Sequence, residues 1–451
     1  MSLKIADQTT SKLATYMAWA VLAILFLLPM HAFFTTWAGS VLGYHDQIRV
    51  WKEIIILFLS LGSLGLLVSD KALRRQFFGS KLTILIVLYV VLGLLRTAYG
   101  YNQGITNFEA AAYGIIGAFR YLVFFLVVGL VASRSQVLQR WWPFVVITPA
   151  TIVVMFGLLQ QFVLDRNFLT HFGYGPDTIP AFQSVDQKTE YARAQSLLRG
   201  PNPLGAYLAL VITILAGMFY RFKSYRFSFG FLIAGSAMLL FFSYSRSAWI
   251  GLIISLAAWV LLVIKDKKIL KVLLIAGLVG TVVVGLAVYT FRDNDYVQNT
   301  IFHSDETSKS TSSTNSVRLQ ALKDGAADVV DHPLGQGLGS AGPASDRGPS
   351  PKIAENYYIQ VAQEVGIFGL ILYLAITAGV GYRLFLRRGQ LLAQVLLASL
   401  IGISVINLVS HAWMDDTLSL LWWGLAGIAL APAIIKGKHY EKQTKSETVA
   451  K

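Results

Sequence analysis

Twelve long apolar runs follow one another along this chain of 451 residues, and no other feature constrains its fold as strongly. The runs lie at about 16–34, 53–69, 82–98, 110–132, 143–165, 203–220, 229–242, 247–264, 269–291, 357–381, 391–410 and 417–435. A helix needs roughly 20 mainly apolar residues to cross a bilayer. The runs therefore predict an all-α, polytopic integral membrane protein with about 12 transmembrane helices.

The composition agrees with a membrane protein. Hydrophobic residues make up 55% of the sequence and charged residues 14%, whereas a soluble domain carries roughly 25% charged residues. The mean hydropathy is +0.58. The first apolar run is long and is not followed by a small-residue cleavage site, so we expect no cleavable signal peptide.

The basic residues predict the orientation, because lysine and arginine concentrate in cytoplasmic loops. With a cytoplasmic N-terminus, the short cytoplasmic loops and the tail carry Lys71, Arg74, Arg75, Lys81, Arg134, Arg140, Arg221, Lys223, Arg226, Lys265, Lys267, Lys268, Lys271, Arg383, Arg387, Arg388, Lys436 and Lys438. The net charge of +14 then follows mostly from topology and does not require nucleic acid as a partner. We expect both termini to be cytoplasmic.

The predicted parts are residues 1–291 with spans one to nine, a large extracytoplasmic loop at 292–356, residues 357–435 with spans ten to twelve, and a basic cytoplasmic tail at 436–451. A second outer loop covers 166–202. Within the large loop, 317–330 has the apolar spacing of a short helix. The stretches 307–316 and 342–352 are rich in Ser, Gly and Pro and are expected to be mobile connections. The glycines of 335–339 fit no phosphate-binding motif and are interpreted as a flexible turn.

Arg246 interrupts an almost continuous apolar stretch from Phe229 to Ile264. A stretch of that length makes two spans, and the break between them falls at the arginine. A charge there is costly unless it binds or pairs with something. The alternative is a tight turn in which the charged end of the arginine reaches the membrane surface.

Three more arginines are expected on the outer side. Arg193 and Arg199 precede the sixth apolar run, and Arg318 begins the short helix of the large loop. A guanidinium group pairs with two oxygens at once and keeps its proton, so several of them at one membrane face suit a diphosphate. Taken singly, each of these arginines would be an ordinary solvated loop charge.

A polar cluster begins the tenth span. Asn356, Gln360 and Gln363, with Glu364 beside them, share one side of the predicted helix. Glu355 lies next to this side and is suited to remove a proton from a sugar hydroxyl within hydrogen-bond reach. The alternative is an acid that caps the helix or favours its dipole.

Arg120 lies well inside the fourth run, between Phe119 and Tyr121, with no acid on the same helix turn. Intramembrane ionisable residues are candidates for function by default. Arg120 either lines the inner wall of a donor cavity or fixes its span to a neighbour through backbone carbonyls. Lys52 and Glu53 are weaker candidates, because a charge at a helix end near the interface needs no function.

Five motifs occur between about residues 190 and 370. They are the Arg193–Gly205 segment with Pro201-Asn202-Pro-Leu-Gly, Ser243-Tyr-Ser-Arg246-Ser-Ala-Trp249, Arg318-Leu-Gln-Ala-Leu, His332-Pro-Leu-Gly-Gln-Gly-Leu-Gly339, and Glu355-Asn-Tyr-Tyr-Ile-Gln360 with Glu364-Val-Gly-Ile-Phe-Gly369. In this order, and placed in this way relative to the apolar runs, they resemble the motifs of the O-antigen ligase and polymerase family.

The resemblance implies a membrane glycosyltransferase of the bacterial cytoplasmic (inner) membrane. Such an enzyme takes a glycan from a polyprenyl diphosphate carrier on the outer face and joins it to an acceptor hydroxyl, with inversion and without a metal or another cofactor. By this resemblance, Arg193 and Arg246 bind the diphosphate. The residues expected to be catalytic are Glu355 and Arg246, and those expected to bind substrate are Arg193, Arg199, Arg318, Asn356, Tyr357 and Arg120.

One position departs from the family pattern. Ligases of the family typically carry His-Asn where this chain has Glu355-Asn356, and the histidine is credited with helping to activate the acceptor. A glutamate can also act as a general base. Ligase and polymerase activities therefore both stay open, with a glycan, a lipid or a wall polymer as acceptor.

Two other functions compete with this prediction. A transporter or flippase of a lipid-linked or anionic solute would also suit twelve spans, but such proteins place polar groups near the midplane, where only Arg120 is expected here. A metal-dependent glycosyltransferase would use Asp415 and Asp416 after His411 as ligands. Acids in such a short outer turn are mostly just solvated.

Overall fold

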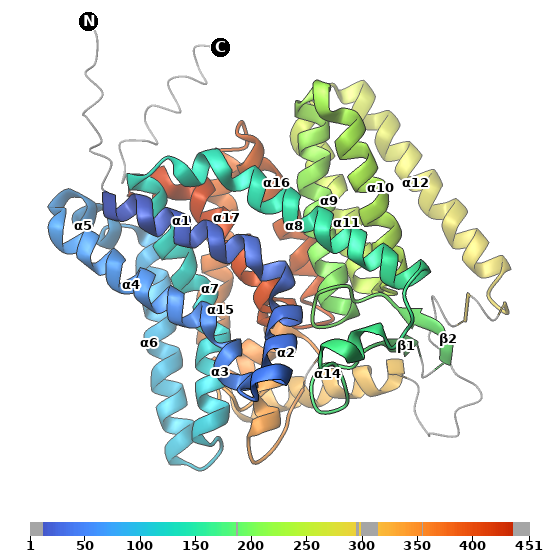
Figure 1. Ribbon diagram of the computed structural model, residues 1–451. Helices are drawn as coiled ribbons and strands as arrows, with labels where there is room; N and C mark the ends of the chain where they lie inside the picture. Colours follow the sequence, from blue (N-terminus) through green and yellow to red (C-terminus); the bar gives the residue numbers. More distant parts are fainter. Residues whose placement is uncertain (1–11, 186–187, 295–296, 299–313, 354, 436–451) are drawn as a thin grey trace, which may run out of the picture.

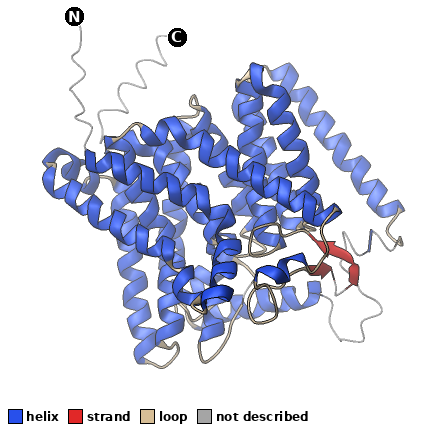
Figure 2. Ribbon diagram, viewed as in Figure 1, coloured by secondary structure: helices blue, strands red, loops and turns tan. Residues whose placement is uncertain are grey.

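The computed structural model describes residues 12–185, 188–294, 297–298, 314–353 and 355–435. Figure 1 shows an assembly of long helices, and Figure 2 shows a single small hairpin of two strands among the described residues. The α-helices are α1 (Lys12–Leu27), α2 (His31–Leu42), α3 (His45–Arg49), α4 (Trp51–Ser69), α5 (Lys71–Phe78), α6 (Lys81–Asn102), α7 (Phe108–Arg134), α8 (Val137–Phe162), α9 (Pro201–Arg221), α10 (Arg226–Phe242), α11 (Arg246–Val263), α12 (Lys267–Thr290), α14 (Thr314–Asp331), α15 (Tyr357–Leu386), α16 (Leu391–Ile406) and α17 (Asp416–Ile435). The strands are β1 (Gln183–Val185) and β2 (Lys188–Arg193), and the short 3-10 helices are η1 (Leu28–Met30), η2 (Phe168–Phe172), η3 (Lys223–Tyr225), η5 (Gly342–Arg347) and η6 (Ala412–Met414).

Every predicted apolar run is mainly helical. In the described part of the chain, nine helical segments are long and apolar enough to cross a membrane, and α16 and α17 contain shorter apolar helices. A helical membrane protein is therefore confirmed. The count of twelve spans, the domain boundaries and the side of the membrane on which each loop lies stay predictions.

Large aromatic side chains form the core between α7 and α17. Trp422 and Trp423 are fully buried, their rings are 5.2 Å apart, and the ring of Tyr121 lies 5.3 Å from that of Trp423. The backbones come close at Gly427, where a Cβ atom would lie 2.9 Å from the carbonyl oxygen of Phe125. Small residues at helix contacts are typical of membrane proteins, because dispersion contacts must replace the hydrophobic effect there.

A second group of helices contains α9, α10, α11 and α16, with α12 at its edge (Figure 1). The helix α11 crosses α16 at Gly251 and Gly402, where a Cβ atom on Gly402 would lie 2.1 Å from the Gly251 carbonyl oxygen. The hairpin β1–β2 and α14 lie at the same end of the molecule (Figure 1). The two loops that the sequence predicted on one side of the membrane thus come together.

The segment 332–339 is not the flexible turn that was predicted. The Gly339 amide donates to Oε1 of Glu364 over 2.8 Å, and the Gly337 amide donates to the Glu364 carbonyl oxygen over 2.8 Å. Gly339 has φ of +86°, and a Cβ atom there would lie 2.2 Å from the carbonyl oxygen of Ala110. Glycine is therefore required by close packing between α7 and α15.

The polar side of α15 is buried under this segment. Gln360 and Gln363 are 1% and 3% exposed. The Gln336 amide donates to the Gln363 carbonyl oxygen over 2.8 Å, and Nε2 of Gln363 donates to Asp328 on α14 over 2.8 Å. These amides attach the large loop to the helices below it.

The prediction of a mobile connection at 342–352 is also wrong. This stretch contains η5, the Gly342 amide donates to the Lys352 carbonyl oxygen over 2.7 Å, and Ser345 is buried. Of the other predicted mobile stretch, residues 307–313 lie outside the described residues. The helix α14 confirms the short helix predicted at 317–330.

Candidate active site

A cavity of about 1320 Å³ lies between the two groups of helices. Pockets for single small molecules usually measure about 300–1,000 Å³, so this cavity has room for parts of two substrates. Eight arginine or lysine residues and five aspartate or glutamate residues line it. The excess of positive charge favours an anionic ligand.

Arg193 and Arg246 line the same cavity, as the diphosphate prediction requires. The segment before α9 is attached to the turn before α11, because the Ala194 amide donates to the Phe242 carbonyl oxygen over 2.9 Å. Nε of Arg193 donates to the carbonyl oxygen of Ser243 over 2.9 Å. Two arginines far apart in the sequence are thereby held at one wall.

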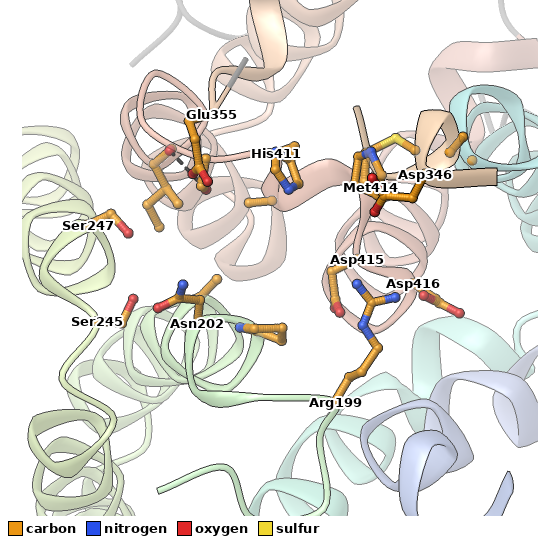
Figure 3. A pocket seen from close by; sticks show the side chains of 18 of the residues that line it. Arg199, Asn202, Ser245, Ser247, Asp346, Glu355, His411, Met414, Asp415 and Asp416 are labelled. Atoms are coloured by element: carbon orange, nitrogen blue, oxygen red, sulfur yellow. Dashed lines mark hydrogen bonds between the residues drawn. The ribbon is translucent and has the colours of Figure 1, made fainter. Parts of the chain in front are cut away.

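The backbone from Arg193 to Arg199 is not an ordinary solvated loop. Ser196 is fully buried; its amide donates to Gln160 over 2.9 Å, and its hydroxyl donates to the Val153 carbonyl oxygen over 2.7 Å. These bonds to α8 fix the segment that carries both arginines. Figure 3 shows Arg199 directed toward Asp415 inside the cavity.

Two helices begin at the cavity. The helix α9 starts after Gly200, α11 starts after Ser245, and neither of these residues caps its helix through a side chain. A helix N-terminus carries partial positive charge on its amide groups and binds phosphate well. The N-terminus of α11 adds to the field of the arginines beside it, whereas Pro201 and Pro203 leave Asn202 as the one amide donor among the first three residues of α9.

Glu355 lines the cavity beside Arg318, with 3.8 Å between its Oε2 and Nε of the arginine. It is one of three non-glycine residues with positive φ in the described part of the chain; the others are Ser196 and Tyr244. Tyr244 also lines the cavity. Such backbone costs about 1–3 kcal/mol and persists only where the surroundings fix it. Glu355 precedes the cap of α15 and is not the cap itself.

Asn356 and Tyr357 are placed away from the cavity. Oδ1 of Asn356 accepts from the Tyr358 amide over 2.9 Å and caps α15, and its Nδ2 donates to the Leu408 carbonyl oxygen over 2.9 Å. Tyr357 is 1% exposed, and its hydroxyl lies 2.9 Å from that of Tyr121. The structure therefore does not bring these two predicted sugar-binding residues to the other predicted site residues.

Arg120 both lines the cavity and holds helices together. It lies 3.3 Å from Glu53 and 3.3 Å from Asp416, and it donates to the Met414 carbonyl oxygen over 2.8 Å. Lys52 lies 2.8 Å from Asp416 and is 1% exposed. We call Lys52, Glu53, Arg120 and Asp416 the buried charge network. The two acids that pair with Arg120 lie on α4 and α17. The spacing of residues along α7 therefore could not reveal them.

The turn before α17 also contributes groups that the sequence led us to regard as solvated. His411 and Asp415 line the cavity. Burial, with help from the charge of Asp416, raises the pKa of Asp415, and burial lowers the pKa of His411. Among the described residues, no group of three or more His, Asp and Glu side chains is placed to hold a metal ion. Metal independence of the reaction stays a prediction.

Residues 229–374 match the family model described as O-antigen ligase. The matched segment includes Arg246, Arg318 and Glu355, whereas Arg193 and Arg199 lie before it. No curated protein matches the chain. The match confirms the family resemblance predicted from the motifs. Over this segment the chain is similar to the O-antigen ligase family, which indicates a membrane glycosyl-transfer enzyme.

Proposed function

We propose that the protein moves a glycan from a polyprenyl diphosphate carrier to an acceptor hydroxyl at the outer face of the membrane, without a metal and with inversion. The observation that carries this proposal is the position of Arg193 and Arg246 at one cavity wall, beside the N-termini of α9 and α11. Arg199 and Arg318 complete a group of four arginines, Arg193, Arg199, Arg246 and Arg318, which we call the cationic rim.

The chemistry of the donor explains why such a rim is useful. The bond that breaks joins the anomeric carbon of the glycan to an oxygen of the diphosphate, and that oxygen gains negative charge as the bond lengthens. Guanidinium groups fixed around it stabilise the transition state more than the ground state. Apolar residues that also line the cavity, such as Ile116 and Ile250, offer contacts for the first isoprenoid units.

Glu355 activates the acceptor hydroxyl in this proposal. Its carboxylate opens onto the same cavity as Arg246, and Figure 3 shows it at the end of the cavity where Ser247 also lies. The cavity is large enough for the diphosphate with its first sugar and for an acceptor sugar. Arg120 lines the inner wall of the cavity, where Glu53 and Asp416 pair with it.

The test uses purified full-length protein with a polyprenyl diphosphate glycan and candidate acceptors, and it measures products by mass. Arg246→Ala should lower the transfer rate about 100- to 1,000-fold, as loss of one transition-state donor does. Arg292→Ala is the matched control, since Arg292 is exposed and does not line the cavity. Wild-type turnover by Arg246→Ala would remove the arginine from the mechanism.

The same assay separates a transporter from an enzyme. The charge network and the break of α15 at Gly366, where φ is +84°, are features that transporters also use. A flippase would return the donor chemically unchanged, whereas a transferase yields a heavier acceptor and free polyprenyl diphosphate. An unchanged donor with every acceptor class tried contradicts the proposal.

A further inference from the structure

His411 lies in the cavity beside Glu355, although the two residues come from different connections. Glu355 directly precedes α15, and His411 lies between α16 and α17. Figure 3 shows the imidazole next to the glutamate on the wall of the cavity, and both residues line it. The two residues are far apart in the sequence, so the sequence did not predict that they lie together.

Backbone contacts fix the two connections against each other. The Tyr357 amide lies 3.0 Å from the Asn407 carbonyl oxygen and 3.2 Å from that of Ser410, and it donates to both. Nδ2 of Asn356 donates to the Leu408 carbonyl oxygen over 2.9 Å. The residues next to the glutamate are thus bonded to the residues next to the histidine. This gives Asn356 a positioning role in place of the predicted contact with sugar.

The imidazole is available for proton transfer. Within the described residues, no hydrogen bond occupies its ring nitrogens. Burial lowers the pKa of His411 below its ordinary value of 6.5, so the ring is neutral at pH 7 and able to accept a proton. The charged groups that face it are Glu355 before α15, Arg318 on α14, Arg199 before α9 and Asp346 on η5. Glu355, in contrast, already faces the guanidinium of Arg318.

We propose that His411 is a further catalytic residue, which takes the proton of the acceptor hydroxyl while Glu355 stabilises the imidazolium that forms. This proposal rests on the proposed glycosyl transfer and specifies how the acceptor is activated. A neutral imidazole can remove a hydroxyl proton at neutral pH, and the negative charge of Glu355 in the same cavity favours the protonated form of His411.

The step balances without any further reactant. The acceptor O–H bond breaks, its proton goes to a ring nitrogen of His411, and the oxygen forms a bond to the anomeric carbon. The bond from that carbon to the diphosphate breaks, and its electron pair leaves with the polyprenyl diphosphate. The imidazolium then returns its proton to water.

The experiment compares His411→Ala, Glu355→Gln and the wild type in the transfer assay from pH 5 to pH 8, with kcat and the KM for the donor measured separately. His411→Ala should lower kcat about 100-fold or more and leave the donor KM nearly unchanged. Free imidazole should restore at least part of the rate to His411→Ala and none to Glu355→Gln. His171→Ala is the matched control, since His171 is exposed on an outer loop.

The dependence of kcat on pH distinguishes proton transfer by His411 from a purely structural role, which would not change the shape of the profile. Because burial lowers the pKa of His411, the acid fall of wild-type kcat should have its midpoint below the ordinary histidine value of about 6.5, and this fall should be absent in His411→Ala. If His411→Ala fails to fold, His411→Gln keeps the volume and carries the kcat and pH tests. A normal kcat in either variant, or an unchanged acid limb without imidazole rescue, overturns the role of His411 while wild-type transfer still supports the enzyme. No transfer by the wild type overturns both.

Discussion

The cationic rim and the buried charge network border the same cavity but differ in charge balance. The network has two cations and two acids in mutual contact. The rim has four arginines, and Glu355 is paired with one of them. Because the cavity is lined by eight cationic and five acidic residues, the excess positive charge lies outside the network.

This difference separates two uses of charge inside a membrane protein. Charges that neutralise each other can be buried, and there they hold helices α4, α7 and α17 together. Charges of one sign gathered at a cavity create a field that favours a ligand of opposite charge. Mutations in the network should therefore act on folding, and mutations in the rim should act on turnover.

The largest effect should come from Arg120→Ala in the network. It leaves Glu53 and Asp416 buried with less compensation, which costs about 3–5 kcal/mol of folding free energy. Thermal unfolding in detergent should show a clearly lower transition temperature than that of the Arg292→Ala control. If Arg120→Ala keeps wild-type stability and loses only activity, Arg120 acts with the cationic rim. The claim that the buried charge network acts on folding would then be wrong for this residue.

Arg246→Lys should give a smaller effect of the opposite kind. Lysine keeps the charge but loses the planar fork that pairs with two phosphate oxygens. We expect about tenfold slower transfer, or ~1.4 kcal/mol of barrier, with unchanged thermal unfolding. Single-turnover rates at saturating donor measure this, and a lower unfolding temperature without slower transfer would assign Arg246 a structural role.

Asn202→Ala should have the smallest effect. It tests whether Arg193 of the cationic rim must be oriented by its neighbour. Oδ1 of Asn202 accepts from Nη2 of Arg193 over 2.7 Å and so orients the guanidinium. Loss of one such bond costs about 1 kcal/mol, which corresponds to about fivefold slower transfer. Asn167→Ala, in an exposed part of the loop between α8 and β1, is the matched control. Equal rates in the two variants would show that Arg193 needs no orientation by its neighbour.

Much of the fold was predictable because membrane helices need long apolar runs. The positions of the helices and the short helix α14 follow from such patterns. The glycines of 335–339 did not reveal their role, because their packing against Ala110 and Glu364 involves contacts far away in the sequence. Composition alone suggested mobility where the structure has close contacts.

Residues that line the candidate cavity were predictable where their charge is conspicuous in the sequence. Arg246 interrupts an apolar stretch and Arg120 lies within one, so each was identified from its cost in the membrane. Asn356 and Tyr357 lie away from the cavity, because Asn356 caps α15 and the hydroxyl of Tyr357 is buried against that of Tyr121. His411 and Asp416 were undervalued, because the sequence showed a short turn and gave no sign of its burial.

From the sequence alone it follows that this protein is a bundle of membrane helices and that several arginines lie in the segments that join its apolar runs. The hydrophobic length of each run and the cost of a charge in lipid are local properties, which a sequence carries directly. The packing of the helices places Arg193 and Arg246 at one wall, pairs Lys52 and Arg120 with Glu53 and Asp416, and brings His411 beside Glu355. Those pairings depend on the packing of distant helices.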